Sequence, residues 1–169
     1  MSEIPTAAAE SRFWSLVESA WDMVGGEPSA RRKALIERDS DDEVYAVDAY
    51  LGEFLANLRS LCVDLSAAEL TDLDRVLERK LYDIDRADIQ EVTDGSDDGF
   101  LYCRGFIVAM GRDFYAAVVA DPEVAVHDAE CESMAYFFAH LHNERFGDYP
   151  DTESGISRET ASNTAGWDG

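Results

Sequence analysis

The chain has 169 residues, of which 46% are hydrophobic, and 36 acidic residues against 14 Lys and Arg give it a formal net charge of −22. This length and composition are typical of one globular domain rather than of a disordered segment. The longest apolar runs are too short to cross a bilayer, and the negative charge repels nucleic-acid phosphates and anionic lipids. We therefore expect neither nucleic acid nor a membrane as a partner.

The N-terminal sequence has no basic region followed by an apolar run, so we expect no secretory signal. Cys62, Cys103 and Cys131 lack the spacing of a redox or metal motif, and three unpatterned thiols are typical of a reducing compartment. The sequence thus predicts a cytoplasmic protein without a disulfide framework.

In the first half of the chain, apolar residues recur at helical spacing and the helix boundaries are marked by local signals. A first helix ends at Gly25-Gly26, and Pro28 opens a second, shorter one. Capping boxes at 40–43 and 66–69 begin two further helices. Their buried stripes are predicted to be Phe13, Leu16, Val17, Ala20 and Val24; then Val44, Val47, Leu51, Phe54, Leu55, Leu58 and Cys62; then Leu70, Leu73, Leu77 and Leu81.

The second half predicts a short piece over 84–92, a long helix over 97–120 that ends at Asp121-Pro122, and a final helix over 129–146. No segment shows β-type alternation. We expect an all-α, single compact multi-helix domain of about six helices around a central buried helix. Residues 1–10 are predicted to be a flexible N-terminus, 11–146 the helical domain, and 147–169 an irregular tail pinned by Ile156 and Trp167.

The 97–120 segment is apolar around much of its circumference, which is typical of a central, largely buried helix. Gly105 and Gly111 each cost such a helix about 1 kcal/mol relative to alanine. We therefore expect a neighbouring helix or a ligand to approach closely at both glycines.

Arg104 projects toward the apolar side of the same helix. Because an unpaired buried guanidinium costs several kcal/mol, we expect a carboxylate partner for it. The candidate partners are Asp48, Asp97 and Asp98.

The run from Gly95 to Phe100, followed by Arg104-Gly105, Gly111-Arg112 and Asp121-Pro122, resembles the bacterial family called domain of unknown function 4240. Phe13-Trp14 and Trp167-Asp168 also fit that pattern, so the resemblance extends over most of the chain from Phe13 onward. The family has no established activity. The resemblance therefore implies an α-helical fold and marks the cluster of Asp97, Asp98 and Arg104 as the place for a shared role.

The acidic run offers oxygen ligands at Asp94, Ser96 and Asp98, as in the first half of a calcium loop. The twelfth position of such a loop requires a bidentate glutamate, but this chain has Gly105 there, so the EF-hand interpretation fails. A looser site that adds Glu130 or Glu132 stays open as an alternative. The simpler interpretation is that Ser96 or Asp97 caps the helix.

A zinc site would require His127, Cys131, His140 and His142 to converge. On one continuous helix His140 and His142 point almost opposite ways, so we predict no zinc site. We assign no metal site to this sequence.

The sequence contains no arranged nucleophile, phosphate loop or metalloprotease motif. We therefore favour a non-enzymatic binding or regulatory module, such as a partner or inhibitor of a basic protein. The alternative is an enzyme or a small-ligand or metal-binding protein with its site at Asp97, Asp98, Arg104 and Arg112. The sequence leaves the cofactor and the oligomeric state open.

Overall fold

The computed structural model describes residues 4–40, 42–93 and 95–168. These residues form eleven α-helices and two short 3-10 helices, with no strand among them, so the all-α prediction is confirmed and the expected count of about six helices is wrong. The helices are α1 (Ala7–Val24), α2 (Gly26–Ala34), α3 (Asp42–Asp48), α4 (Leu51–Cys62), α5 (Ala67–Asp83), α6 (Ala87–Thr93), α7 (Asp97–Ala109), α8 (Arg112–Ala120), α9 (Glu132–Ala135), α10 (Phe137–Phe146) and α11 (Thr164–Trp167), with 3-10 helices η1 (Leu35–Glu37) and η2 (Pro122–Val124).

The count differs because three predicted helices are each interrupted and because α11 forms within the predicted irregular tail. The stripe from Val44 to Cys62 is divided between α3 and α4, and the predicted final helix begins only at Glu132 and breaks at Tyr136. The predicted long helix over 97–120 ends at Ala109 and restarts at Arg112. The apolar positions were identified correctly, but periodicity alone does not report where the backbone turns.

Gly111 explains the break in the predicted long helix. Its φ of 98° lies in the region that favours glycine, and a side chain there would collide with Arg32 and Glu18. Arg32 in turn donates to the carbonyl of Met110 at 2.7 Å and forms an ion pair with Glu18 at 2.6 Å. A buried guanidinium therefore occupies the space between α7 and α8, and the chain must bend around it.

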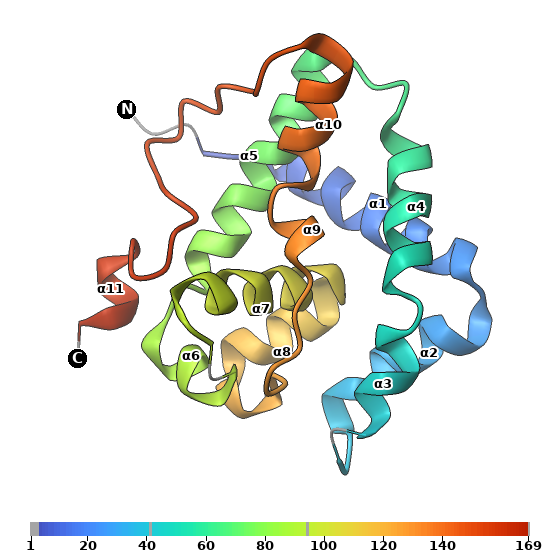
Figure 1. The fold of residues 1–169 in the computed structure, drawn as a ribbon, viewed down its shortest axis with the longest axis vertical. Coiled ribbons are helices and arrows are strands. Elements are labelled where there is room, and N and C mark those ends of the chain that lie inside the picture. Colours follow the sequence, from blue (N-terminus) through green and yellow to red (C-terminus); the bar gives the residue numbers. More distant parts are fainter. Residues whose placement is uncertain (1–3, 41, 94, 169) are drawn as a thin grey trace.

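Figure 1 shows α1, α4, α5 and α10 in the upper part of the molecule, with α6, α7 and α8 below them. Helix α1 packs against α4 and α5, α5 against α10, and α7 against α8 and α9. The predicted central helix survives in α7, where every residue from Phe100 to Ala109 except Tyr102 is buried.

The expected close approach at Gly105 is confirmed. A side chain there would collide with the carbonyl oxygen of Cys131, which is the N-cap residue of α9. The absence of a side chain at Gly105 thus allows α9 to lie directly against α7.

Two predicted helix starts are confirmed by their hydrogen bonds. Ser66 and Glu69 form the reciprocal capping box of α5, and Ser96 accepts from the N–H of Gly99 at 3.1 Å to cap α7. The predicted box over 40–43 includes residue 41, which lies outside the described residues.

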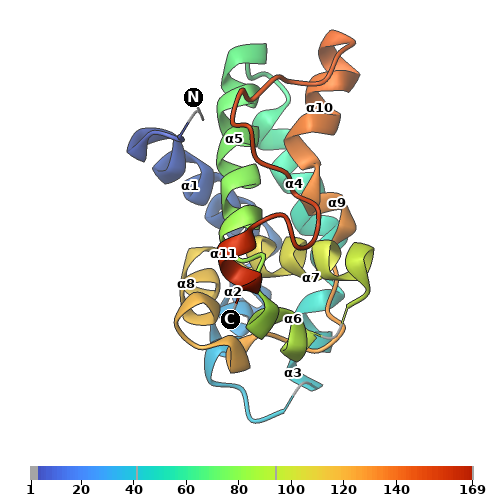
Figure 2. The same ribbon diagram turned by 90° about the vertical axis from the view of Figure 1, so that its left-hand side faces the viewer.

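The C-terminal segment, defined here as residues 148–168, leaves α10 and runs along α5 to reach α11 (Figure 2). It forms no helix or strand before residue 164, and Ile156 and Trp167 are both partly buried. Trp167 packs edge-on against Phe100 of α7 with ring centroids 6.1 Å apart. Within the part of the chain that is described, no helix combines the length and apolarity needed to span a membrane.

Candidate binding site

Two buried carboxylates one helical turn apart distinguish α5. Asp74 is 2% exposed and Glu78 is 8% exposed. Their i, i+4 spacing places them on one face, directly beside the buried stripe that contains Leu77 and Leu81. Because ionised side chains are rarely buried without compensation, this pair marks a specific environment.

The compensating groups come from the C-terminal segment. The Arg158 guanidinium lies 2.7 Å from Asp74 Oδ1, donates to the carbonyl of Ala135 at 2.7 Å, and stacks over the Tyr136 ring at 5.0 Å. Arg158 is itself buried. The segment thus delivers one cation into a site that already holds two acidic groups.

The second carboxylate, Glu78, is held by hydroxyl groups. The side chains of Thr152 and Ser154 each donate to its Oε2 atom at 2.7 Å. Burial raises the pKa of Asp74 above its usual value, and the neighbouring charge of Arg158 only partly opposes that effect. The site therefore holds two carboxyl groups but only one guanidinium to balance their charge.

These groups line a pocket of about 420 Å³, named here the Asp74 pocket. Its charged residues are two carboxylates and one guanidinium, and its remaining walls are mostly aromatic and small. The lining residues are Asp74, Glu78, Tyr136, Ala139, His140, Tyr149, Pro150, Thr152 and Arg158. His140 lies against the rings of Tyr136 and Tyr149.

A second set of buried charges fixes the far end of the C-terminal segment. Asp85 is fully buried and accepts from the backbone N–H groups of Ala161 and Asn163 at 3.0 and 2.9 Å. Its Oδ1 also accepts from the indole N–H of Trp167 at 2.8 Å. One carboxylate therefore holds three donors of the segment.

Arg104 is fully buried as expected, but the predicted ion pair is wrong. Its guanidinium donates to the carbonyls of Leu81 and Arg158 at 3.0 and 2.8 Å, and it stacks over Phe100 at 4.8 Å. Backbone carbonyls therefore supply the acceptors in place of the predicted carboxylate. Burial lowers the pKa of Arg104 to about 10, and the charge of Asp85 opposes this, so the side chain stays cationic at neutral pH.

The other predicted partners of Arg104 lie elsewhere. Asp48 is exposed on α3, and the Asp98 side chain is exposed in the first turn of α7. The link to Asp97 runs through its backbone, because Thr160 donates to the Asp97 carbonyl at 2.5 Å and contacts Arg104 at 3.4 Å.

The four predicted site residues do not form one cluster. Asp97 begins the 13-residue α7 and Arg112 follows its C-terminal end, so the two are separated by about 20 Å. Arg112 is exposed at the start of α8. Of the four, the structure brings together only Arg104 and the backbone of Asp97, beneath the C-terminal segment.

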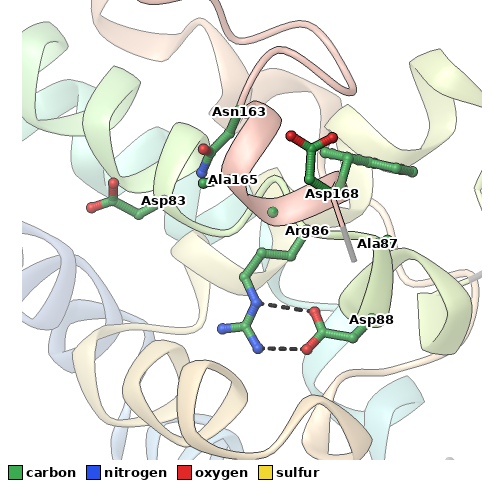
Figure 3. Close-up of a pocket in the computed structure, with 9 residues that line it drawn as sticks. Asp83, Arg86, Ala87, Asp88, Asn163, Ala165 and Asp168 are labelled. Carbon is green, nitrogen blue, oxygen red and sulfur yellow. Dashed lines mark hydrogen bonds and ion pairs between the residues drawn. The ribbon is translucent and has the colours of Figure 1, made fainter.

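A second pocket, of about 460 Å³, lies beside α11 (Figure 3). In it Arg86 forms two hydrogen bonds with Asp88, at 3.0 and 2.7 Å, and this contact lowers the pKa of Asp88. Burial raises the pKa of Asp83 on the same wall. Since Arg86 is already engaged with Asp88 and with the carbonyl of Val119, this pocket holds fewer uncompensated buried groups than the Asp74 pocket.

The candidate metal ligands are dispersed. His127 and Cys131 precede α9 rather than sharing a helix, and His142 is buried while His140 is exposed. His142 Nδ1 lies 2.6 Å from the carbonyl of Asp148. Among the described residues, no three His, Cys, Asp or Glu side chains are grouped as a metal site, and residue 94 lies outside them.

Sequence reasoning missed Asp74, Glu78, Asp85 and Arg158. Two signals pointed to them. Asp74 and Glu78 lie at helical spacing beside a leucine stripe, and Arg158 is the only Lys or Arg between residues 147 and 169. A lone arginine in an acidic, serine-rich segment is a candidate for a specific buried contact.

The fold and this site define an all-α protein with an acid-lined surface pocket, part of whose wall is its own C-terminal segment. The model of the family described as protein of unknown function DUF4240 matches residues 34–144, which is more than half of the chain, so the chain belongs to that family. The resemblance found in the sequence is thereby confirmed over residues 34–144, a span that includes Asp74, Glu78, Asp85 and Arg104. Phe13-Trp14 and the C-terminal segment lie outside the matched span. No curated protein and no solved structure matches the chain.

Proposed function

We propose that this chain is a non-enzymatic binding module that holds a basic protein partner by a cationic side chain seated in the Asp74 pocket. The observation that carries the proposal is the composition of that pocket, in which two buried carboxylates and two tyrosine rings face a single guanidinium. Carboxylates and aromatic faces both attract ammonium and guanidinium groups, and more strongly where water is excluded.

The surroundings of the pocket support a protein partner. Tyr149, which lines the pocket, is 61% exposed, so a large aromatic side chain stands at the surface there. Exposed aromatic residues are typical of interface anchors. The net charge of −22 favours encounter with a basic protein through long-range attraction.

The enzymatic alternative, with its site at Asp97, Asp98, Arg104 and Arg112, receives less support. Arg104 is enclosed by backbone carbonyls and the C-terminal segment, and Arg112 lies at the other end of α7. A reacting group would need several of these side chains within about 3 Å of one point. We therefore keep the binding role as the proposal.

The test is calorimetric titration of the full chain with a synthetic peptide of alternating arginine and glycine, compared with the same peptide carrying neutral citrulline. We expect the arginine peptide to bind and the citrulline peptide to bind at least about tenfold more weakly, because a guanidinium charge is lost. Raising the salt from about 50 mM to about 300 mM should weaken the arginine complex.

Variants separate the pocket from general surface charge. Glu78→Gln and Tyr149→Ala should each weaken binding of the arginine peptide about fivefold. The matched control Glu53→Gln removes one exposed carboxylate from α4 and should change it less than about twofold. Equal losses in all three variants, or equal binding of the citrulline peptide, would show that the pocket does not recognise a cation.

A further inference from the structure

The C-terminal segment contacts α5 in the manner of a bound peptide. Between residues 149 and 158 it forms no helix or strand, with positive φ at Glu153 and Gly155, and its backbone runs along α5 (Figure 2). Glu78 binds the hydroxyls of Thr152 and Ser154, and Asp74 binds Arg158. Further along, Arg104 binds the carbonyl of residue 158, and Asp85 binds the N–H groups of residues 161 and 163.

The two sides of this contact lie on opposite sides of the C-terminal end of the family match. Asp74, Glu78, Asp85 and Arg104 all lie within the residues matched by the family model, whereas every group that they bind between residues 152 and 167 lies beyond its end at residue 144. We call the surface formed by these four side chains the α5 groove. The family-matched part of the chain thus supplies the groove, and the residues outside it supply the occupant.

The contact is held by polar groups rather than by apolar burial. The buried side chains of the segment are Ser154 and Arg158, while Ile156 and Trp167 are only partly buried. A hydrogen bond contributes about 1 kcal/mol net, because water replaces it when the contact opens. Segments with few buried apolar contacts open at lower free energy than a core.

The groove also contains buried ionisable groups whose desolvation is only partly offset by the neighbouring charges. Burial raises the pKa of Asp74 despite Arg158, and it lowers the pKa of Arg104 despite Asp85. Both directions mean that the ionised forms are held at a cost in the closed state. An opened groove would return these groups to water.

From these observations we infer that the C-terminal segment is an internal occupant of the α5 groove, and that an arginine-bearing segment of a basic partner replaces it. This inference rests on the proposed function. Arg158 occupies the place of the partner's arginine beside Asp74. The contacts define the preferred sequence: an arginine with a hydroxyl residue four positions before it, as Ser154 is, and another two positions after it, as Thr160 is.

The first test uses hydrogen exchange of the unmodified full chain. The N–H groups of Ala161 and Asn163 should exchange through local opening, at least about tenfold faster than the buried amides of α5 and α7. Exchange of these amides only together with the α5 core would overturn the inference, because the segment would then be an inseparable part of the fold. This measurement needs no variant.

The second test asks whether the groove takes a peptide in trans. The probe is a synthetic peptide of residues 151–163, compared with the same peptide carrying citrulline in place of its arginine. Arg158→Gln in the full chain should loosen the internal segment and increase the affinity for the arginine peptide about tenfold, since an occupied groove reduces apparent affinity. Arg12→Gln, which removes an exposed arginine paired with Glu69 at 3.2 Å, should leave the affinity unchanged.

The outcomes distinguish the two proposals. Equal peptide affinity in the unmodified protein, Arg158→Gln and Arg12→Gln overturns the internal-occupant inference. If the Arg158→Gln protein binds the 151–163 peptide while the unmodified protein fails to bind the arginine–glycine peptide, the groove is upheld and the basic partner of the proposed function is not.

Discussion

Two interfaces of this molecule are built on opposite principles. Where α1 meets α4, the contact is apolar: Trp21 stacks on Phe54 with ring centroids 4.7 Å apart, and both side chains are fully buried. Where α5 meets the C-terminal segment, the buried side chains are charged or hydroxylic, with Asp74 and Arg158 at the centre. Apolar burial is strong but non-directional, whereas each buried donor needs one acceptor in one place.

This comparison shows that the two interfaces have different roles in the fold. The apolar interface stabilises the whole protein, whereas the polar interface can open locally. The α1–α4 interface buries apolar surface area, and the free energy of unfolding increases in proportion to that area. The α5 interface fixes the position of an irregular segment, and its net contribution to stability is small because each polar group also interacts well with water. We therefore expect substitutions in the first to unfold the whole protein, and substitutions in the second to release one segment.

The largest expected effect is that of Phe54→Ala. Removing a fully buried aromatic ring that stacks on Trp21 should lower the free energy of unfolding by about 3–5 kcal/mol through lost burial and a residual cavity. Urea denaturation measures this loss, and all helices should unfold in one transition. The control Tyr45→Ala, at a side chain that is 73% exposed, should change stability by less than about 0.5 kcal/mol. A small loss at Phe54 would contradict the view that this interface carries the stability.

An intermediate effect is expected for Gly166→Ala in α11. A side chain there would collide with the carbonyl oxygen of Asp85 and with Arg86, so the variant should displace α11 at a cost of about 1–3 kcal/mol. The change should appear as loss of the shifted NMR resonance of the Trp167 indole N–H, which Asp85 holds at 2.8 Å, while the core resonances persist.

The control for this substitution is Gly52→Ala in α4, where nothing lies near the added methyl group. Helix propensity then predicts a gain of up to about 1 kcal/mol and an unchanged Trp167 resonance. Cooperative unfolding of the Gly166→Ala variant would show that α11 is part of the core rather than a separable clamp.

The sequence predicted those features of the fold that depend on neighbours along the chain. The stripe from Val44 to Cys62, the stop at Gly25 and the capping box of α5 all follow from spacing within one or two helical turns. The break at Gly111 could not be predicted in this way. It depends on Arg32, whose contact with the carbonyl of Met110 spans 78 residues.

The candidate site shows the same limit more sharply. The burial of Arg104 followed from its place on an apolar helix, but its acceptors are backbone carbonyls, and these have no signature in the sequence. The Asp74–Arg158 contact joins α5 to the C-terminal segment, and no local pattern relates the two. Composition identified Asp97 and Asp98 because they are adjacent, whereas the buried acids of α5 are spread among leucines.

The smallest expected effect, and the most specific, is the pH dependence of the contribution that Asp74 makes to the free energy of unfolding. Burial raises the pKa of Asp74, so the folded state binds its proton more tightly than the unfolded state does. Its contribution to stability therefore falls as the pH rises from the unfolded value, about 3.9, to the raised folded value, and stays constant above that. Asp74→Asn removes this titration, so the stability of the variant relative to the unmodified protein should rise as the pH increases above about 4.

Urea denaturation at several pH values measures this relative stability, and Asp72→Asn is its matched control. Asp72 is an exposed neighbour on α5 whose ion pair with Arg75 lies at the surface, so its substitution should not reproduce the trend. If instead Asp74→Asn loses stability relative to the unmodified protein as the pH rises, the attraction of Arg158 outweighs burial. The C-terminal segment would then be held by a net favourable ion pair, and an external arginine would have to displace it against that gain.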